Sequence, residues 1–524
     1  MNTSGEPIRI PIVFAESDPD MTAIVAHAMA EARAAQPDWA RMSVKRRLRL
    51  IRELRHLIAE HATQLAETSA SARQRPAVES LTAEVMPLVE ACRFLERNAA
   101  QILGPRKVGR SGRPLWLAGI HTEIERVPFG VVLIIGPGNY PLLLPGVQVI
   151  QSLVAGNSVL LKPGVGGMRA ARELCTLLVR AGIDSRLVAV LPESTEAARI
   201  AIAAQPDKLI FTGSSATGEK ILAQLAPHLI PATMELSGND AVIIRADADL
   251  NLVAKALTFG LKLNAGATCM APKRAFVHRS LATELEGRLA QHFGRGLGSL
   301  AQSHPPAVVT TSVKNDAQKP DVDADNTRLC RLISDAQSRG AHFVAGGILG
   351  DGTIKLPVVL AGVSPKSDVL QEDLFAPVLS IVTATDDSEA VSFTNECPHA
   401  LTVSIFSRDE GAARCLAAQI QAGVVTINDL IVPTADARVP FGGCKRSGFG
   451  ATRGAEGLLE LTTAKVVTSS RGKLRPAFEP SQPGDEQMFE AYLQLANGRG
   501  LKARWAVLTT LLRIVAKRWK SISP

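Results

Sequence analysis

The chain has 524 residues and a net charge of +8, with 46% hydrophobic and 21% charged residues. This length exceeds one simple core, so we expect two or three domains, and the composition excludes the disordered and the fully membrane-embedded classes of protein. Aromatic residues make up only 4% of the chain and no nucleic-acid recognition motif occurs, so we expect no nucleic-acid partner.

The cysteines are few and scattered. Seven occur, none of them in a CxxC spacing, which argues against a disulfide framework and against a zinc site. The first residues, MNTSGEPIRIPIVFAESD, do not combine a basic segment with a long apolar run, so we expect no secretory signal. The predicted protein is cytoplasmic and holds no structural metal.

Two periodicities follow each other along the chain. Residues 21–103 repeat apolar positions every three or four residues, as in RRLRLIRELRHLIAEHATQLAETSA, and this predicts a helical layer. From residue 130 the short apolar segments GVVLIIGP, SVLLKP, RLVAVLP, KLIFTG and ATMEL alternate with helix-like segments. Such alternation predicts parallel strands buried on both faces, in a doubly wound α/β sheet.

A second α/β set is expected after Cys269, with a strand in KRAFVH and a helix near 280–294. The polar stretch 305–327 predicts a surface connection. Residues 458–470 predict a late strand, and RGKLRPAFEPSQPGDE after it has the composition of a linker.

The C-terminal segment 499–520, RGLKARWAVLTTLLRIVAKRWK, predicts an amphipathic helix. Its apolar residues recur at spacings of three and four, and basic residues flank them. The apolar centre is shorter than the roughly 20 residues that a membrane-spanning helix needs. Two partners therefore stay open for this helix: an anionic lipid surface or a neighbouring subunit. The stripe consists of Trp505, Leu508, Leu512, Val515 and Trp519.

Three residues are candidates for chemistry. Cys269 lies between small residues in LNAGATCMAPKR, where a thiol stays accessible, although a buried unreactive cysteine is the commoner case. Glu235 ends an apolar run, so burial should raise the pKa of its carboxyl and make it a better base near neutral pH; a salt-bridged glutamate is the alternative. Asn139, between Gly138 and Tyr140, has a turn as its simpler explanation.

Six blocks around Cys269 carry a resemblance to a known family. They are VPFGVVLIIGPGNYP (127–141), VAGNSVLLKPG (154–164), FTGSSATG (211–218), MELSG (234–238), QEDLFAPV (371–378) and PFGGCKRSGFG (440–450). In this order they resemble the aldehyde dehydrogenase superfamily over about residues 20–470. The resemblance implies two doubly wound α/β domains with a small β bridging and oligomerisation element, and a homodimer or homotetramer.

The implied domain boundaries are as follows. The cofactor-binding domain covers 1–105 and 126–237, the catalytic domain 238–446, and the bridging element 106–125 and 458–472. Residues 473–524 are the linker and basic amphipathic tail.

The resemblance also implies a reaction and a site. A small-molecule aldehyde is oxidised to its carboxylic acid through a cysteine thiohemiacetal and thioester, with NAD or NADP as cofactor. Cys269 is the implied nucleophile, Asn139 the oxyanion donor together with the Cys269 backbone N–H, and Glu235 the base for deacylation. The implied cofactor contacts are Lys162, Gly213, Ser214, Asp373, Phe375, Pro137 and Leu236; Phe441 and Tyr140 are the implied substrate-lining residues.

The sequence departs from the family pattern at several places. Ser237 and Ala267 replace a glycine and a glutamine, and Ala376 replaces a glycine beside the site. Asp373 is one methylene shorter than the family's glutamate, and Val165 stands where many NAD-preferring members carry a ribose-binding glutamate. These changes leave two alternatives open: a catalytically weak binding or scaffold protein of the same fold, and a relative that transfers the acyl group to coenzyme A or runs reductively.

Overall fold

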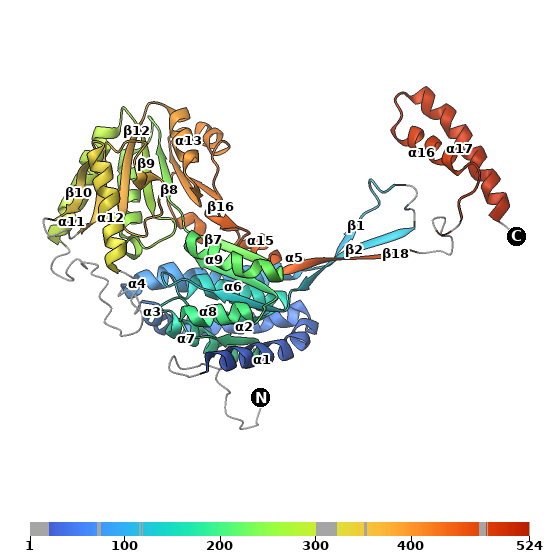
Figure 1. The fold of residues 1–524 in the computed structure, drawn as a ribbon, viewed down its shortest axis with the longest axis horizontal. Helices are drawn as coiled ribbons and strands as arrows, with labels where there is room; N and C mark the ends of the chain where they lie inside the picture. The colour runs from blue at the N-terminus through green and yellow to red at the C-terminus, as the bar shows by residue number, and fades with distance from the viewer. Residues whose placement is uncertain are drawn as a thin grey trace, which may run out of the picture. The chain divides into compact units, whose positions relative to one another are not determined.

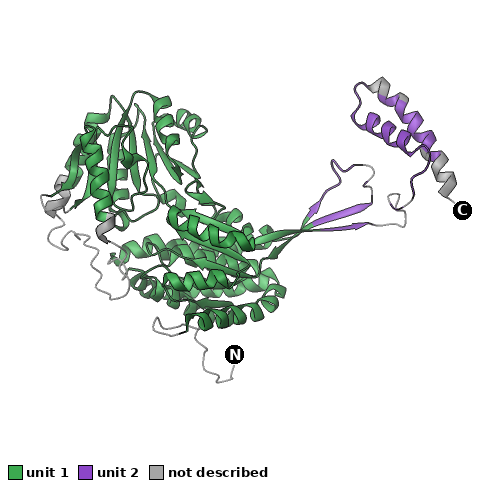
Figure 2. Ribbon diagram, viewed as in Figure 1, with its two compact units in different colours: residues 1–106, 124–466 green, residues 107–123, 467–524 purple. Residues whose placement is uncertain are grey.

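The structure is a computed structural model that describes residues 20–70, 75–114, 117, 119–299, 322–349, 354–470, 478 and 480–522. The chain divides into two compact units (Figure 2). Unit 1 covers Met1–Arg106 and Ile124–Val466, and unit 2 covers Lys107–Glu123 and Val467–Pro524. Both large sheets belong to unit 1, and Figure 1 labels several of their strands.

The first sheet of unit 1 has six strands in the order β17-β7-β6-β3-β4-β5, all parallel except β17. The strands predicted from the apolar segments after residue 130 are all present in it. Their bounds are β3 Val131–Ile135, β4 Ser158–Lys162, β5 Val188–Val190, β6 Lys208–Gly213, β7 Ala232–Leu236 and β17 Gly448–Phe449.

Helices cover both faces of this sheet because successive strand residues point to opposite sides. Val132 and Ile134 of β3 pack with helices of one cluster, and Val131, Leu133 and Ile135 pack with helices of the other. The helices of the first cluster are α2 Val44–Glu60, α5 Met86–Ile102, α6 Leu143–Ala155 and α7 Met168–Arg180; those of the second are α1 Met21–Arg41, α8 Thr195–Ala203 and α9 Ser215–Leu225.

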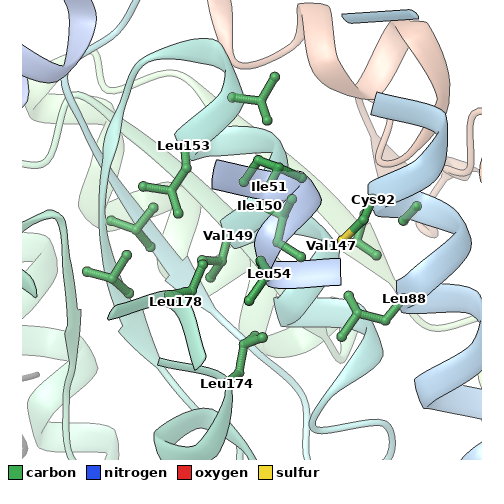
Figure 3. Packing of buried hydrophobic residues seen from close by; sticks show 14 of the residues in the cluster. Ile51, Leu54, Leu88, Cys92, Val147, Val149, Ile150, Leu153, Leu174 and Leu178 are labelled. Carbon is green, nitrogen blue, oxygen red and sulfur yellow. The ribbon is translucent and has the colours of Figure 1, made fainter. Parts of the chain in front are cut away.

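Figure 3 shows the centre of the first cluster, where side chains from four helices meet. Ile51 and Leu54 are fully buried on α2, and Leu88 and Cys92 are fully buried on α5. The helical layer predicted over residues 21–103 is therefore present. It is completed by the short elements α3 Ala62–Ala70, α4 Ala77–Ser80 and the π-helical turn Leu81–Val85.

The second sheet has seven strands in the order β10-β11-β12-β9-β8-β14-β15, parallel except for the β10–β11 pair. Two clusters of apolar residues again lie on its opposite faces, so the predicted fold of two doubly wound α/β sheets is confirmed. The strand predicted in KRAFVH is β9, whereas β8 precedes Cys269. The bounds are β8 Asp240–Ile244, β9 Pro272–His278, β10 His342–Ile348, β11 Ile354–Ala361, β12 Val378–Ala384, β14 Thr402–Phe406 and β15 Val424–Ile427.

The helices beside the second sheet are α10 Leu250–Lys262, α11 Ala282–Ser299, α12 Val322–Ser338, α13 Asp387–Glu396 and α14 Glu410–Ala417. Most of the surface connection predicted at 305–327 lies outside the described residues, and its last part is the beginning of α12. Short strands β13 His399–Ala400 and β16 Cys444–Lys445 pair with each other, and α15 is Gly454–Leu459.

A separate three-stranded sheet has the order β1-β2-β18, with β1 Arg106–Val108, β2 Ile120–Pro128 and β18 Thr462–Ser470. The late strand predicted at 458–470 is thus β18, although its first residues belong to α15. After Thr462 every residue of β18 is exposed.

Unit 2 also contains two helices, α16 Asp485–Asn497 and α17 Leu501–Ile522. The predicted tail helix is α17. The sequence patterns did not predict α16, which begins at the end of the stretch read as a linker. Among the described residues, no helix is both long enough and apolar enough to cross a membrane.

Candidate active site

The site lies at the edge where the parallel strands of the first sheet end. β6 and β7 are neighbours in register, so that Thr212 pairs with Glu235 and Gly213 with Leu236. β3 ends two residues before Pro137, on the other side of β6. Because parallel strands carry their carboxyl ends to one edge, segments about 100 residues apart in the sequence meet there.

The loop of the predicted nucleophile Cys269, residues 263–269 (the nucleophile loop), joins α10 to β9 and contains backbone that L-residues rarely adopt. Asn264, Ala265 and Gly266 have φ values of 49°, 51° and 75°. Each left-handed non-glycine residue costs roughly 1–2 kcal/mol, so this loop needs support from its surroundings. Glu79 Oε1 accepts a hydrogen bond from the Asn264 backbone N–H at 2.8 Å.

Asn139 and Asn264 connect the nucleophile loop to the segment after β3. The Asn139 side chain donates from Nδ2 to the Ala267 carbonyl at 3.1 Å, and Asn264 Nδ2 donates to the Asn139 carbonyl at 3.0 Å. Asn264 Nδ2 also bonds the Ala267 carbonyl at 3.1 Å. An amide nitrogen carries two hydrogens, so Asn139 keeps a second donor beyond the bond to Ala267.

A cavity of about 340 Å³ opens beside these segments. It brings together most of the site residues predicted from the sequence. Its lining contains Pro137, Gly138, Asn139, Leu144, Thr212, Gly213, Ser214, Glu235, Leu236, Ser237, Cys269, Asp373 and Phe375. Ser237, singled out as a departure from the family pattern, therefore borders the cavity directly.

Three predicted site residues do not line this cavity. Lys162 is the last residue of β4 and is buried, and burial lowers the pKa of its ammonium. The Tyr140 hydroxyl bonds Thr268 Oγ1 at 2.7 Å beside the nucleophile loop. Phe441 is buried and packs against the guanidinium of Arg453, whose carbon lies 4.5 Å from the ring centroid.

Glu235 is buried and only partly satisfied. Its Oε2 accepts a hydrogen bond from Thr452 Oγ1 at 3.1 Å, while its Oε1 has no hydrogen-bond partner among the described residues. Burial raises the pKa of the Glu235 carboxyl, against the opposing effects of the Arg453 charge and the Thr452 hydrogen bond. A buried carboxylate oxygen without a donor is costly and is a common feature of functional sites.

The Cys269 residue is half-buried. Burial raises the pKa of this thiol, and the nearby carboxyl groups of Glu235 and Asp240 raise it further. The charge of Arg453 opposes this effect. In this arrangement the thiol needs a base to become a thiolate at neutral pH.

Several residues around the site were not found from the sequence. Thr452 and Arg453 follow β17, and Arg453 is buried with a φ of 62° and donates from Nη1 to the Thr434 carbonyl at 2.5 Å. Lys273 is buried on β9. No periodicity marks these positions; the only available signal was a charged residue within an otherwise apolar strand or beside a glycine.

The turn from β6 to α9 has the features expected of a phosphate-binding turn and of a capped helix. Ser214 is the N-cap of α9, and its Oγ accepts a hydrogen bond from the Thr217 N–H at 3.3 Å. A Cβ at Gly213 would lie 2.4 Å from the Phe211 ring, so this position requires glycine. Backbone N–H groups at this helix start border the cavity and suit an anionic ligand.

Next to the same cavity, the backbone of Gly138 comes close to the backbone of Val165 in the loop before α7. A Cβ at Gly138 would lie 2.7 Å from the Val165 carbonyl oxygen. The Val165 side chain is exposed, but the carboxylate of Glu193 accepts hydrogen bonds from the N–H groups of Gly166 at 2.8 Å and Met168 at 2.5 Å. The loop that contains the uncharged Val165 therefore lies beside the negative charge of Glu193.

Comparison with known proteins places the chain among aldehyde-oxidising enzymes. The profile of the aldehyde dehydrogenase family matches residues 13–467. The chain is 30% identical over 478 residues to the 4,4'-diapolycopene aldehyde oxidase of a Methylomonas species, covering 91% of this chain and 88% of that protein. It is 31% identical over 473 residues to a Mycolicibacterium smegmatis protein whose name, succinate-semialdehyde dehydrogenase [NADP(+)], is itself provisional; the match covers 90% of this chain and 87% of that protein.

Solved structures resemble the chain as well. The NAD+ complex of an aldehyde dehydrogenase from Bacillus cereus matches with a TM-score of 0.74 and 26% identity, over 86% of this chain and 89% of that one. A betaine aldehyde dehydrogenase from Staphylococcus aureus in complex with NAD+ matches with a TM-score of 0.76 and 23% identity, over 88% of this chain and 90% of that one. The second likeness supports the fold alone.

Proposed function

We propose that this chain, which belongs to the aldehyde dehydrogenase family, oxidises an aldehyde to its carboxylic acid with NAD or NADP as hydride acceptor and with Cys269 as the nucleophile. The family predicted from the six sequence blocks is confirmed, and so is the assignment of the chain as an NAD(P)-dependent oxidoreductase. The roles of individual residues are our proposal. The observation that carries them is the convergence of Cys269, Glu235 and Asn139 on one cavity.

In the first step Cys269 Sγ gives its proton to solvent and forms a bond to the aldehyde carbon, while the carbonyl π pair moves to oxygen. The resulting oxyanion is stabilised by the second N–H of the Asn139 amide and by the Cys269 backbone N–H. A bound nicotinamide would supply the acceptor for the hydride that leaves the same carbon. A thioester on Cys269 is then the species that the protein must hydrolyse.

Glu235 serves the hydrolytic step. Its unpartnered Oε1 takes a proton from a water molecule, the water oxygen bonds to the thioester carbon, and the C–S bond breaks to release the acid. The sulfur leaves as thiolate and takes the proton from the Glu235 carboxyl, so that both groups are restored for the next cycle. A buried carboxylate available to water favours a free acid as product over transfer of the acyl group to coenzyme A.

The cavity fits the nucleotide that this family uses. The start of α9 presents Gly213 and Ser214 to a pyrophosphate, and Pro137 and Leu236 lie on either side of that turn. Asp373 and Phe375 line the same cavity, where they would contact the nicotinamide ribose and ring. Lys162 would reach the adenosine ribose from the end of β4.

Glu193 is predicted to bias the enzyme toward NAD. A 2′-phosphate held near Lys162 and Val165 would meet the carboxylate at the start of α7 and be repelled. We expect Glu193→Gln, which keeps one hydrogen-bond acceptor and removes the charge, to raise the NADP-to-NAD ratio of kcat/KM about tenfold. The exposed Glu196→Gln on α8 is the matched control and should leave the ratio unchanged. An unchanged ratio in Glu193→Gln would disprove the idea.

The test of the proposed reaction is an aldehyde panel of graded chain length with both cofactors, followed by the absorbance of the reduced nicotinamide. Formation of the free acid without coenzyme A is the expected result. A folded, cofactor-binding protein with no turnover on any aldehyde would favour the alternative of a binding or scaffold protein. Turnover that requires coenzyme A would favour an acyl-transferring relative.

We further propose that unit 2 contacts an anionic membrane surface from the cytoplasm. Its helices carry exposed apolar residues: Phe489 and Leu493 lie one turn apart on α16, and Trp505 and Leu512 lie two turns apart on α17. In the sequence, basic residues lie before, between and after the apolar residues of α17, which matches the charge of anionic lipid. These are Arg499, Lys502, Arg504, Arg513, Lys517, Arg518 and Lys520.

Deletion of residues 480–524 is expected to move the protein from the pellet to the supernatant when it is centrifuged with anionic vesicles, while aldehyde oxidation stays within twofold. Oxidation should be retained because all residues that line the cavity precede residue 376, so the deletion removes none of them. Neutral vesicles are the control. A different result would favour a neighbouring subunit as the partner of this tail: the full-length protein never sediments with anionic vesicles, and the deletion lowers the number of chains in the oligomer.

The exposed β18 supports a proposed homodimer or homotetramer. β18 is an edge strand of its sheet, it is exposed along almost its whole length, and Val466 is 60% exposed. Unpaired edges of this kind are normally covered or paired with another chain. Sedimentation equilibrium would test the proposal, since the mass of a single chain would contradict it.

A further inference from the structure

Two loops meet at a short distance beside the cavity. One is the nucleophile loop, and the other, residues 371–377, carries the cavity residues Asp373 and Phe375. Gly266 has a φ of 75°, and a Cβ there would lie 2.6 Å from Pro377 Cα, so the two backbones are in direct contact at this point. Their separation therefore decides where the thiol lies relative to Asp373 and Phe375.

A single ammonium group bonds both loops. Lys273, the second residue of β9, is only 3% exposed. Its Nζ donates to the Ala376 carbonyl at 2.6 Å and, at the long limit of a hydrogen bond, to the Gly266 carbonyl at 3.5 Å. β9 is a central strand of the second sheet, so the lysine projects from a rigid element.

We propose that Lys273 is a positioning residue for aldehyde oxidation, whose ammonium holds the nucleophile loop against the loop of Asp373 and Phe375 and places a positive charge near the Cys269 sulfur. The proposal rests on the proposed function for its catalytic meaning. Its structural content, a charged clamp between two loops, can be tested without turnover.

The surroundings show why a charge at this position needs an explanation. The hydrogen-bond partners of Lys273 in the described structure are backbone carbonyls, not a carboxylate. A buried cation without a bonded counter-ion is destabilising, and an apolar side chain of similar volume would usually pack at lower cost. Burial lowers the pKa of Lys273 to about 8, against the opposing charges of Asp373, Asp240 and Cys269.

Other charged groups act on the same region. Arg453 and Glu235 act on Cys269 with opposite signs, and burial raises the pKa of Asp240 to about 7. Arg274, next to Lys273, points elsewhere and donates to the carbonyls of Asn239 and Phe393. His399 lies within electrostatic range of Asp373 and Arg274. Among these charged groups, Lys273 is thus the buried cation that donates a hydrogen bond to the nucleophile loop.

The test compares Lys273→Met with Lys208→Met. Lys208 is equally buried, begins β6 and bonds Glu460 Oε2 at 3.2 Å, away from the cavity lining. Both proteins are alkylated with iodoacetamide over a range of pH, and the labelled peptide that contains Cys269 is quantified by mass spectrometry. Because loss of a nearby cation disfavours the thiolate, Lys273→Met should lower the alkylation rate of Cys269 about tenfold at pH 7, where the wild-type ammonium is charged. Lys208→Met should leave it at the wild-type value.

Turnover supplies the second readout. We expect Lys273→Met to lower kcat by about tenfold or more with little change in KM for the aldehyde, and Lys273→Arg to restore the wild-type alkylation rate at pH 7 and part of kcat. In the wild type, kcat should decline as Lys273 loses its proton above about pH 8, and Lys273→Arg should lack this alkaline decline.

An alkylation rate at pH 7 and a kcat in folded Lys273→Met that match those of Lys208→Met would overturn the proposal. If Lys273→Met does not fold, an alkaline decline of kcat that persists unchanged in Lys273→Arg would overturn it instead. If the wild type oxidises no aldehyde at all, the proposed function fails, whereas the alkylation rates at pH 7 still decide the role of Lys273.

Discussion

Cys269→Ser is expected to lower aldehyde-dependent reduction of NAD(P) by about a thousandfold or more. The serine hydroxyl has the geometry of the thiol, but its proton is far harder to remove, and the burial that already raises the pKa of the Cys269 thiol would disfavour an alkoxide even more. The measurement is the initial rate of nicotinamide reduction at saturating aldehyde. NAD(P) binding should stay intact because the substitution removes no contact of the cavity other than the sulfur.

Cys444→Ser is the matched control for this experiment. Cys444 is also half-buried, but its Sγ donates to the Ala400 carbonyl at 3.6 Å and it does not line the cavity. Its replacement should leave the rate within twofold of the wild type. A Cys269→Ser protein that kept the rate of the control would mean that the nucleophile is another group and that the proposed thioester does not form.

The order of the strands explains why much of this site could be predicted from the sequence. Asn139, Gly213 and Glu235 each lie at or just after the carboxyl end of a buried apolar segment, and such segments pair in parallel when helices separate them. One edge of one sheet then collects residues far apart in the chain. Cys269 needed the family resemblance, since no periodicity marks the loop before β9.

The contacts that tune the site could not be predicted, because they depend on where irregular backbone turns. Arg453 reaches the neighbourhood of Glu235 through a φ of 62°, a conformation that an arginine rarely adopts and that no sequence pattern signals. The guanidinium of the same arginine also packs against the ring of Phe441, a residue that we predicted from the family resemblance to line the substrate site. Lys273 bonds backbone carbonyls, which every residue has, so no sequence pattern could indicate its partners.

In the C-terminal tail the sequence predicted one of the two helices. The apolar stripe of α17 was visible at spacings of three and four, but α16 was not predicted, because its segment DEQMFEAYLQLAN follows a stretch rich in proline and glycine. The exposed side chains of both helices, not of one, now define the apolar surface of unit 2. A test that deletes α17 alone would therefore leave half of that surface in place.

Glu235→Gln is expected to separate the two halves of the reaction. Hydride transfer precedes hydrolysis of the thioester, so a rapid burst of reduced nicotinamide of about one equivalent per active site should remain, while the steady-state rate falls by about a hundredfold. The glutamine can still accept the Thr452 hydrogen bond, so the cavity should keep its shape. Stopped-flow absorbance measures both phases in one experiment, and Glu460→Gln, whose carboxylate bonds Lys208 outside the cavity lining, is the control.

The pH dependence of the wild type provides an independent check on the same carboxyl group. Only the ionised form can take a proton from water, and burial raises the pKa of Glu235. The steady-state rate should therefore fall as the pH drops through this raised pKa, at a higher pH than for an ordinary glutamate, and the burst should persist there. In Glu235→Gln this acid decline should be absent from the residual rate. A variant that turns over at the wild-type rate would show that water reaches the thioester without Glu235, and the free carboxylate oxygen would then need another explanation.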